Sequence, residues 1–532
     1  MNRDPNLDCD AVVIGSGMGG LTSAALLARL HGWKVVVLER HWRAGGFTHE
    51  FARPGGFRWD VGLHYVGQIE TPGMFRDALR AATGGGLAWR RMADPFERLV
   101  FPEFEVALHG GRFREDLAAA FPGEAATVDR FLADVRRATS YLGVLGMRGV
   151  APRPVVAAAK VLLARRRRLA LGTTGAWLRT HVADPRLRAV LGARWGDYGL
   201  PPARSAFLAH ATITGHYLDG GYYPVGGAGR IAQAAAGVIA SAGGAVRVRA
   251  EVERILVERG RAVGVRLASG ETLRARLVVS DAGARNTYLK LLPAEVPLPF
   301  REELASTPPG MACVTLYLGL SRSPEALGVH GENFWIHAGL DQDALWERRG
   351  GLLAGDAPQV YLSFPSMKDP EARAHTAEVI ATVDASAFAP FAGTHWKRRG
   401  AEYEKLKERI GDALLAAVER RLPGFSKLVA FRELSTPLTS EGFTSHPQGE
   451  IYGIPVTPER FTRPYLQPRT PVPGLLLTGA DAMILGIAGA TMGGLMCAAA
   501  AAGPGTFRKV AQEARRLDAP PATPRATSLS TA

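Results

Sequence analysis

The chain has 532 residues, of which 47% are hydrophobic and 21% are charged, and this composition excludes a disordered protein. Its length exceeds what one hydrophobic core usually serves, so we expect two domains. Its formal net charge is +14, but arginine far outnumbers lysine and no RNA or DNA module is recognisable, so we expect no nucleic-acid partner. Three scattered cysteines and the lack of an H-x-x-x-H or H-E-x-x-H pair favour neither a disulfide framework nor a metal site, and we expect no metal.

A short β-branched strand, a G-x-G-x-x-G turn and a helix open the chain. Gly15 permits the tight bend, Gly17 lets backbone N–H groups approach a pyrophosphate, and Gly20 lets the helix pack closely on the strand. A second apolar strand ends at Glu39, nineteen residues after Gly20, where a carboxylate can accept hydrogen bonds from the ribose hydroxyls of an adenosine. The segment therefore predicts a dinucleotide-binding Rossmann-like unit. Its first strand begins about ten residues into the chain, which leaves no room for a targeting peptide and favours a cytoplasmic location.

A second glycine pair, Gly45–Gly46, follows the acid at a short distance. It allows another backbone segment to approach the same pyrophosphate, and Arg40 and Arg43 can supply cations to it. Simple NAD-binding units do not need this second loop. FAD enzymes of the glutathione-reductase type with an amine-oxidase-like extension commonly have it.

Two stretches bear on membrane contact. Residues 484–503 carry no charge, but they are mostly glycine and alanine, which favours packing inside the protein over a transmembrane span. Residues 154–169 read PVVAAAKVLLARRRRL, an apolar helix ending in four arginines that can lie in an anionic membrane interface. The alternative is a core helix with a solvated basic end. A peripheral position on the inner face of the membrane is therefore an alternative to a purely cytoplasmic one.

The nucleotide domain is expected to be discontinuous. Residues 243–282 contain three strand-like runs, which predicts a β-rich module interposed in that domain. The prediction is an α/β fold with an FAD-binding domain and a second, α+β substrate domain that faces the membrane. The FAD-binding domain takes residues 8–65, 216–300 and 441–510, the substrate domain takes 66–215 and 301–440, and a disordered tail takes 515–532.

The C-terminal part supplies the other half of the cofactor site. A strand ends at Asp481, and GIAGATMGG opens the next helix. In the flavoprotein family an acid at this position holds the ribityl chain, and the helix N-terminus near Gly489 to Met492 points its positive end at the flavin. We therefore predict FAD as the cofactor. No second G-x-G-x-x-G follows a strand, so NAD(P)H, if it is the electron donor, is external and binds differently.

The chain resembles the all-trans-retinol 13,14-reductase group of the carotenoid desaturase and isomerase superfamily. The resemblance rests on eight motifs in order: DVGLHYVG (60–67), WGDYGLPP (195–202), HYLDGGYYPVGG (216–227), SDAGARNTYLKLLP (280–293), FPSMKDP (364–370), STPLT (435–439), GEIYG (449–453) and PVPGLLLTGAD (471–481). It implies a saturase or isomerase acting on a conjugated polyene. It also implies that Val252 contacts the adenine end and that Ser280 lies near the nucleotide. Met492 departs from the glutamine or serine that related proteins often carry.

Candidate catalytic groups come from two of these motifs. His64 and Tyr65 belong to a segment that runs beside the isoalloxazine in this superfamily, and they are candidates for placing a proton or polarising the polyene. Asp197 and Tyr198 are second candidates, because an acid flanked by aromatic residues has a raised pKa and can donate a proton. The alternatives are that His64 only hydrogen-bonds flavin or backbone, and that Asp197 caps a helix or binds a turn.

Together these features predict an FAD-dependent oxidoreductase that reduces a carbon–carbon double bond of a retinoid- or carotenoid-like polyene. A carotenoid isomerase or desaturase that uses the same flavin site is an alternative within enzymes. A polyene lipid carrier that retains flavin is the alternative outside enzymes.

Overall fold

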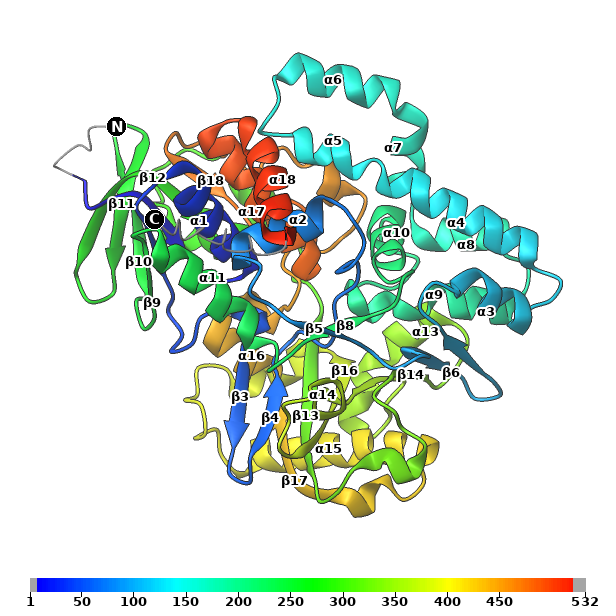
Figure 1. Cartoon of the computed structure of the whole chain (residues 1–532). Coiled ribbons are helices and arrows are strands. Elements are labelled where there is room, and N and C mark those ends of the chain that lie inside the picture. The colour runs from blue at the N-terminus through cyan, green and yellow to red at the C-terminus, as the bar shows by residue number, and fades with distance from the viewer. Residues whose placement is uncertain (1–6, 520–532) are drawn as a thin grey trace, which may run out of the picture.

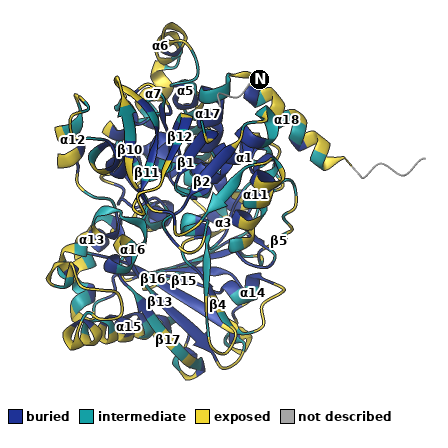
Figure 2. Ribbon diagram, turned by 90° about the vertical axis from the view of Figure 1, so that its left-hand side faces the viewer, coloured by how far each residue is buried: buried dark blue, intermediate teal, exposed yellow. Residues whose placement is uncertain are grey.

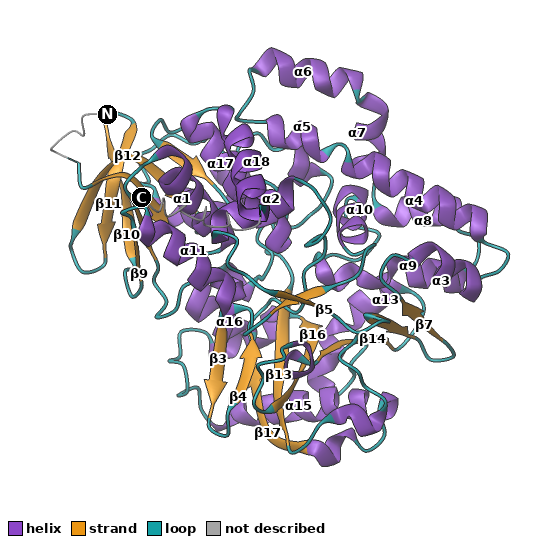
Figure 3. Ribbon diagram, viewed as in Figure 1, coloured by secondary structure: helices purple, strands orange, loops and turns teal. Residues whose placement is uncertain are grey.

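The computed structural model describes residues 7–519, and two β-sheets organise them (Figures 1 and 3). The first sheet lies in the part of the molecule that holds both ends of the described chain, and the second lies in the lower part of Figure 1. Each sheet draws strands from distant parts of the sequence.

The first sheet has the order β10-β11-β12-β1-β2-β9, with β18 also paired to β12. Its strands are β1 (Cys9–Ile14), β2 (Val35–Leu38), β9 (Ala245–Arg247), β10 (Val252–Glu258), β11 (Arg261–Leu267), β12 (Thr272–Ser280) and β18 (Leu475–Leu477). The pairs among β9, β2, β1, β12 and β18 are parallel, whereas β10, β11 and the first half of β12 form an antiparallel meander. The interposed β-rich module is thus confirmed, and β12 is shared between module and central sheet.

Helices pack around this sheet because their apolar faces meet the buried valines and leucines of the parallel strands (Figure 2). They are α1 (Met18–His31), α2 (Met74–Thr83), α11 (Gly229–Ser241), α17 (Gly486–Ala502) and α18 (Gly505–Asp518). Helix α18 corrects the expected tail. Residues 515–518 are helical because Val510 and Ala514 bury an apolar stripe of the helix, and the rest of the predicted tail, 520–532, lies outside the described residues.

The second sheet has the order β17-β13-β16-β15-β14-β6-β7. Its strands are β6 (Glu97–Val100), β7 (Glu105–Leu108), β13 (Ala312–Leu320), β14 (Asn333–His337), β15 (Gln359–Ser363), β16 (His375–Val383) and β17 (Val429–Ser435). Helix α15 (Ala401–Arg421) packs on one face. Successive side chains of a strand point to opposite faces, so on β13 Val314 and Leu316 contact the core under α15 while Thr315 and Tyr317 face a cavity.

Two separate pairs of short antiparallel strands complete the β-structure. Strands β3 (Glu50–Arg53) and β4 (Phe57–Asp60) pair with each other, and β4 contacts β16. Strands β5 (Trp89–Arg91) and β8 (Tyr222–Pro224) form the other pair. The segment between Asp60 and β5 carries the DVGLHYVG motif and is therefore held between the two sheets.

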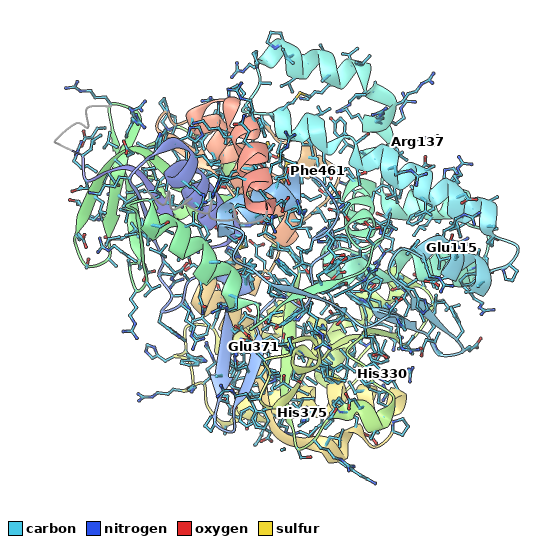
Figure 4. All side chains as sticks on the ribbon, viewed as in Figure 1. Glu115, Arg137, His330, Glu371, His375 and Phe461 are labelled. Carbon is cyan, nitrogen blue, oxygen red and sulfur yellow. The ribbon has the colours of Figure 1, made fainter. Side chains whose placement is uncertain are left out.

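A helical layer covers the remaining side, and exposed side chains such as Glu115 on α3 and Arg137 on α4 lie on its outside (Figure 4). Its members are α3 (Phe113–Ala120), α4 (Ala125–Thr139), α5 (Leu142–Met147), α6 (Arg153–Leu162), α7 (Ala164–Ala170), α8 (Thr174–His181), α9 (Pro185–Gly192) and α10 (Phe207–His216). Shorter helices complete the fold: α12 (Arg301–Ser306), α13 (Gln342–Glu347), α14 (Pro365–Lys368) and α16 (Pro437–Thr444).

The apolar, arginine-ending stretch is two helices, α6 and α7, and not the single helix that the sequence predicts. The helix breaks at Leu163, whose φ and ψ of −100° and 24° lie outside the helical region. Figure 2 shows α6 projecting from the body with mostly exposed residues. Within residues 7–519, no helix is both long enough and apolar enough to cross a bilayer.

Candidate functional site

A cavity of about 1120 Å³ runs between the two sheets and is lined mainly by apolar atoms. It exceeds the roughly 300–1000 Å³ of a typical small-molecule pocket. Its wall begins at the glycine turn after β1, follows the segment around Gly62, and continues along the inner face of the second sheet at Tyr317 and Tyr361. One cavity is thus large enough for a dinucleotide and for a second, apolar molecule beside it.

The glycine turn has the close contacts that the spacing predicts. Gly15 has a φ of +91°, which favours glycine, and a Cβ on Gly20 would lie 2.3 Å from the carbonyl oxygen of Gly15. A Cβ on Gly17 would lie 2.5 Å from Oδ2 of Asp281. A Cβ on Gly46 would lie 3.0 Å from Cα of Gly17, so the second glycine pair reaches the first turn. Any side chain here would fill the space beside the N-terminus of α1.

Glu39 lies at the end of β2, and its carboxylate ties the two glycine segments together. It accepts hydrogen bonds from the backbone N–H of Ser16 at 3.0 Å, from Oγ of Ser16 at 2.6 Å and from the backbone N–H of His41 at 2.7 Å. The backbone N–H of Gly45 in turn donates to Oγ of Ser16 at 3.1 Å. Glu39 also lines the cavity, as an acid that holds ribose hydroxyls must.

The two arginines after Glu39 differ in their surroundings. The guanidinium of Arg40 contacts the hydroxyl of Ser445 and lies 3.4 Å from Glu251, whereas Arg43 is exposed and donates to the carbonyl oxygen of Glu50 at 2.7 Å. Both line the cavity, as does Val252 at the start of β10. These three residues, expected at the pyrophosphate (Arg40 and Arg43) and at the adenine end (Val252), therefore all lie on the cavity wall.

Ser280 ends β12 but does not line the cavity, because its hydroxyl is hydrogen-bonded to Oγ1 of Thr287 at 2.7 Å. The next residue, Asp281, does line it. Its carboxylate accepts hydrogen bonds from the backbone N–H groups of Gly17 and Gly20, and burial raises its pKa to about 7. Asp281 is a site residue that the sequence analysis missed, although the SDAG motif contains it.

Asp481 follows β18 and lines the cavity, but its oxygens also serve the protein. Oδ2 accepts from the backbone N–H of Ala284 at 2.8 Å, and Oδ1 accepts from that of Ile454 at 3.0 Å. The guanidinium of Arg460 lies 3.4 Å away and supplies a buried counter-charge. This acid therefore fixes three segments around the cavity in addition to any contact with a ligand.

The helix that follows Asp481 opens with GIAGATMGG, as the sequence predicts. Helix α17 starts at Gly486, because Leu485 has an extended ψ of 171° and ends the preceding turn. Its first turn lines the cavity through Gly489 and Ala490, whereas Met492 packs among core side chains. Of the segment Gly489–Met492, which the sequence places near the helix N-terminus, Gly489 and Ala490 therefore line the cavity and Met492 does not.

His64 belongs to a buried group of charged side chains that we call the Lys368 cluster, formed by Asp60, His64, Lys368 and Glu378. Nδ1 of His64 lies 2.8 Å from Oε2 of Glu378. Both atoms are buried, and neither has a hydrogen-bond partner elsewhere among the described residues. Lys368 donates to the carbonyl oxygen of His64 at 2.9 Å, and the hydroxyl of Tyr223 donates to Asp60 at 2.8 Å.

Burial sets the charges in the Lys368 cluster. It raises the pKa of Glu378 to about 8 and that of Asp60 well above its usual value, and it lowers the pKa of Lys368 to about 8 and that of His64 to about 3. His64 is therefore a neutral imidazole at the cavity wall, where it can accept or donate a hydrogen bond.

Tyr65 and Asp197 meet in a second group, the Asp197 cluster, which also contains Glu97, Arg194 and Trp335. The Tyr65 hydroxyl contacts Oε1 of Glu97 and lies 3.0 Å from Oδ2 of Asp197. Arg194 and the indole of Trp335 each donate to Glu97 at 3.2 Å. Burial, followed by the charge of Glu97, raises the pKa of Asp197 to about 7. An acid of this kind is protonated in mildly acidic solution and can donate that proton into the cavity that it lines.

Tyr198 lies elsewhere. Its hydroxyl is 3.1 Å from Nδ1 of His210 in the core of the helical layer, and its side chain does not line the cavity. This placement gives no support to Tyr198 as a catalytic group. Tyr361, which the sequence analysis did not single out, does line the cavity, and its hydroxyl is buried without a hydrogen-bond partner.

Comparisons with known proteins agree with this geometry. A family model described as an NAD(P)-binding Rossmann-like domain matches residues 13–78. An all-trans-retinol 13,14-reductase from Danio rerio is 34% identical over 519 residues, which cover 92% of this chain and 85% of the relative. A chloroplastic prolycopene isomerase from Daucus carota is 26% identical over 84% of this chain and 72% of its own length.

Among solved structures, the cyclohexylamine oxidase from Brevibacterium oxydans aligns with a TM-score of 0.57 at 17% identity. The alignment covers 96% of this chain and all of the oxidase. At this identity the likeness shows the fold, which is the α/β fold of flavin-dependent amine oxidases with a Rossmann-like nucleotide unit.

Proposed function

Because the chain belongs to the all-trans-retinol 13,14-reductase family, we propose that it is an FAD-dependent oxidoreductase that reduces a carbon–carbon double bond of a retinoid- or carotenoid-like polyene. The observation that carries the proposal is the continuous cavity, which joins a dinucleotide cradle to an apolar space lined by Tyr65, Asp197 and Trp335. Reduction of such a bond needs a hydride on one carbon and a proton on the other.

The residues of the cradle fit FAD. Gly15, Gly17 and Gly46 leave no side chain where a Cβ would collide, and Glu39 is placed for ribose hydroxyls. The first turns of α1 and α17 lie at the cavity, and no side chain caps either helix. Asp481 is held at the same wall for the ribityl chain. When bound and reduced, FAD supplies the hydride.

Tyr65 and Asp197 are our candidates for the proton. Asp197 is protonated below about pH 7 and lines the cavity, and its carboxyl lies 3.0 Å from the hydroxyl of Tyr65, which also lines it. His64, which burial keeps neutral, lines the same cavity and positions the polyene beside it. Both arrangements keep net charge away from the apolar substrate, which stabilises its binding.

The electron donor and the membrane contact complete the proposal. An external NAD(P)H can reduce the flavin, since the sequence has one G-x-G-x-x-G turn after a strand and FAD uses it. The helix pair α6–α7 exposes Val155, Val161 and Leu162 to 50%, 77% and 84%, next to Arg165–Arg168. Exposed aliphatic side chains beside arginines favour a contact with an anionic membrane over a core role for this segment.

The test is a single-turnover experiment. The purified protein is checked for bound flavin, reduced chemically without oxygen and mixed with a panel of retinoids and carotenoids. We expect a product two hydrogens heavier and flavin reoxidised in proportion. A product of lower mass, formed by the oxidised protein, would show a desaturase, and bound flavin that no polyene oxidises or reduces would show a carrier.

The second candidate is a redox-neutral isomerase, which the similarity to prolycopene isomerase favours. It predicts products of unchanged mass with altered double-bond geometry, and no net change in the flavin. The same experiment therefore separates it from the reductase.

A further inference from the structure

Aromatic side chains surround Asp197 on the cavity wall. The cavity is lined there by Tyr65, Tyr217, Tyr361, Tyr452 and Trp335. The rings of Tyr65 and Tyr217 stack with centroids 4.1 Å apart, and those of Trp335 and Tyr361 lie 4.6 Å apart. Burial raises the pKa of each of the four tyrosines, and the charge of Asp197 is the next largest cause in every one of them. We call Asp197 and these five rings the tyrosine pocket.

Asp197 is an acid without a cation of its own. The neighbouring Glu97 is paired with Arg194 at 3.2 Å, whereas within residues 7–519 Asp197 forms no ion pair. The carboxylate of Asp197 accepts one hydrogen bond from the described residues, from the Tyr65 hydroxyl to Oδ2 at 3.0 Å, so Oδ1 has no partner among them. The hydroxyl of Tyr361 is buried and also has no partner. The tyrosine pocket thus offers two oxygen atoms that can accept hydrogen bonds, one of them on an unpaired acid.

This combination fits an organic ammonium group. An ammonium group donates hydrogen bonds and accepts none, which suits two free acceptor oxygens. The faces of tyrosine and tryptophan rings attract cations, and a buried cation needs an acid as its counter-charge. A carboxylate ligand would instead be repelled by Asp197, and an alcohol would leave the acid without a cation. Because the cavity beside the pocket is lined mainly by apolar atoms, the rest of the ligand is a hydrocarbon.

We propose that the tyrosine pocket binds the ammonium group of an apolar amine, with Asp197 as its counter-ion, Tyr361 as a hydrogen-bond acceptor and the surrounding rings as cation–π partners. The binding goes beyond the proposed function and does not rest on it. Inhibition of polyene reduction by a bound amine does rest on it, since Asp197 is the proton donor proposed there.

Titration calorimetry with geranylamine and geraniol tests the binding, because the two probes share one carbon skeleton and differ in the charged group. The FAD-loaded, full-length protein at pH 7.5 should bind geranylamine at least about tenfold more tightly than geraniol. Asp197→Asn should weaken geranylamine binding by about tenfold to a hundredfold and change geraniol binding less than about threefold. Geraniol binding and retained flavin also show that this variant is folded.

Glu253→Gln is the matched control, because Glu253 is a partly exposed acid on the same cavity wall but outside the tyrosine pocket. It should leave geranylamine binding unchanged. Equal affinities of the wild-type protein for the two probes would overturn the proposal, and so would equal losses in Asp197→Asn and Glu253→Gln. Tyr361→Phe, which keeps the ring and removes the acceptor, should weaken geranylamine binding less than Tyr361→Leu, which removes both.

The pH dependence of binding is a test that needs no variant. Free Asp197 has a pKa of about 7 and would be ionised beside a bound ammonium group. The affinity for geranylamine should therefore rise about twentyfold from pH 5.5 to 7.5, with about one proton released for each amine bound at pH 5.5. The other ionisable groups nearby are the four tyrosines, His64, Lys368, Glu378 and the Glu97–Arg194 pair. Burial holds the pKa of the tyrosines above this range and that of His64 below it, and Lys368 and Glu378 titrate at about 8. An affinity that does not change with pH would refute the ion pair. These assays need no turnover, so their outcome is separate from that of the reductase assay.

Discussion

Replacing Glu97 with glutamine should move the pH dependence of polyene reduction to lower pH. The Tyr65 hydroxyl contacts Glu97 and lies 3.0 Å from Asp197, which places the two carboxylates about 5 Å apart on either side of it. Two charges at that distance with an effective dielectric constant of about 20 interact by about 3 kcal/mol, or about two pH units. Glutamine keeps the shape and the hydrogen-bond acceptor but removes the charge that raises the pKa of Asp197.

The sign follows from the role of Asp197. The acid donates a proton only when protonated, so the rate of polyene reduction is high below its pKa of about 7 and falls as the pH rises through that value. In Glu97→Gln the pKa is lower, and Arg194, which loses its partner, lowers it further. The fall in rate should therefore begin one to two pH units earlier.

The assay is stopped-flow reoxidation of the reduced flavin by a polyene between pH 5 and 9. Asp197→Asn is the matched control. It should slow the reaction by about 10²- to 10⁴-fold and abolish the decline, because no titrating donor remains. If Glu97→Gln retains flavin and shows the wild-type profile, or if Asp197→Asn keeps the wild-type decline, the assignment of Asp197 as the proton donor is wrong.

Three further predictions concern the cradle, the buried charges and the membrane. Gly17→Val should abolish FAD retention, because its Cβ would lie 2.5 Å from Asp281, and a yellow, flavin-loaded variant would contradict the cradle. Lys368→Met should destabilise the protein by about 3 kcal/mol, because it removes a buried ammonium that donates to the carbonyl oxygen of His64, to Asn333 and to Ser363. An unchanged melting temperature would show that the fold does not depend on these hydrogen bonds. Replacing Arg165–Arg168 with glutamine should weaken binding to anionic vesicles and reduce its salt dependence, which co-sedimentation measures. Unchanged binding would argue for α6–α7 as a solvated helix pair.

The nucleotide half of the site was predictable because its signals are local. The spacing of Gly15, Gly17 and Gly20 determines a turn between adjacent elements, and Glu39 follows at the end of the next strand. Gly46 lies in the next loop of the chain and contacts the same glycine turn at Gly17, so its position was also predictable. The raised pKa of Asp197 was also predictable, since its aromatic neighbours in WGDYG indicate burial.

The partners of the catalytic candidates were not predictable, because they come from the second sheet. Glu97 reaches Tyr65 only through the parallel pairing of β6 with β14, and Glu378 reaches His64 through the register of β16. The sequence offers one signal for Glu378, which is the only acid in the largely apolar strand HTAEVIATV.

The two buried clusters together explain how ionisable groups behind the cavity wall are compatible with an apolar chain, because only His64, Tyr65, Asp197 and Trp335 of these clusters line the cavity. Glu97 is neutralised by Arg194 at 3.2 Å, and the positive charge of Lys368 lies among Asp60 and Glu378, whose raised pKa values keep a proton on the pair. Asp197 has no such cation of its own, and burial holds it protonated up to about pH 7. These charges are then largely balanced while the polyene binds, and Asp197 holds a proton at the cavity wall itself. Because an ionised Asp197 would face an apolar ligand, binding of the polyene should raise the pKa of Asp197 further. The substrate itself therefore keeps Asp197 protonated and neutral until the hydride is transferred.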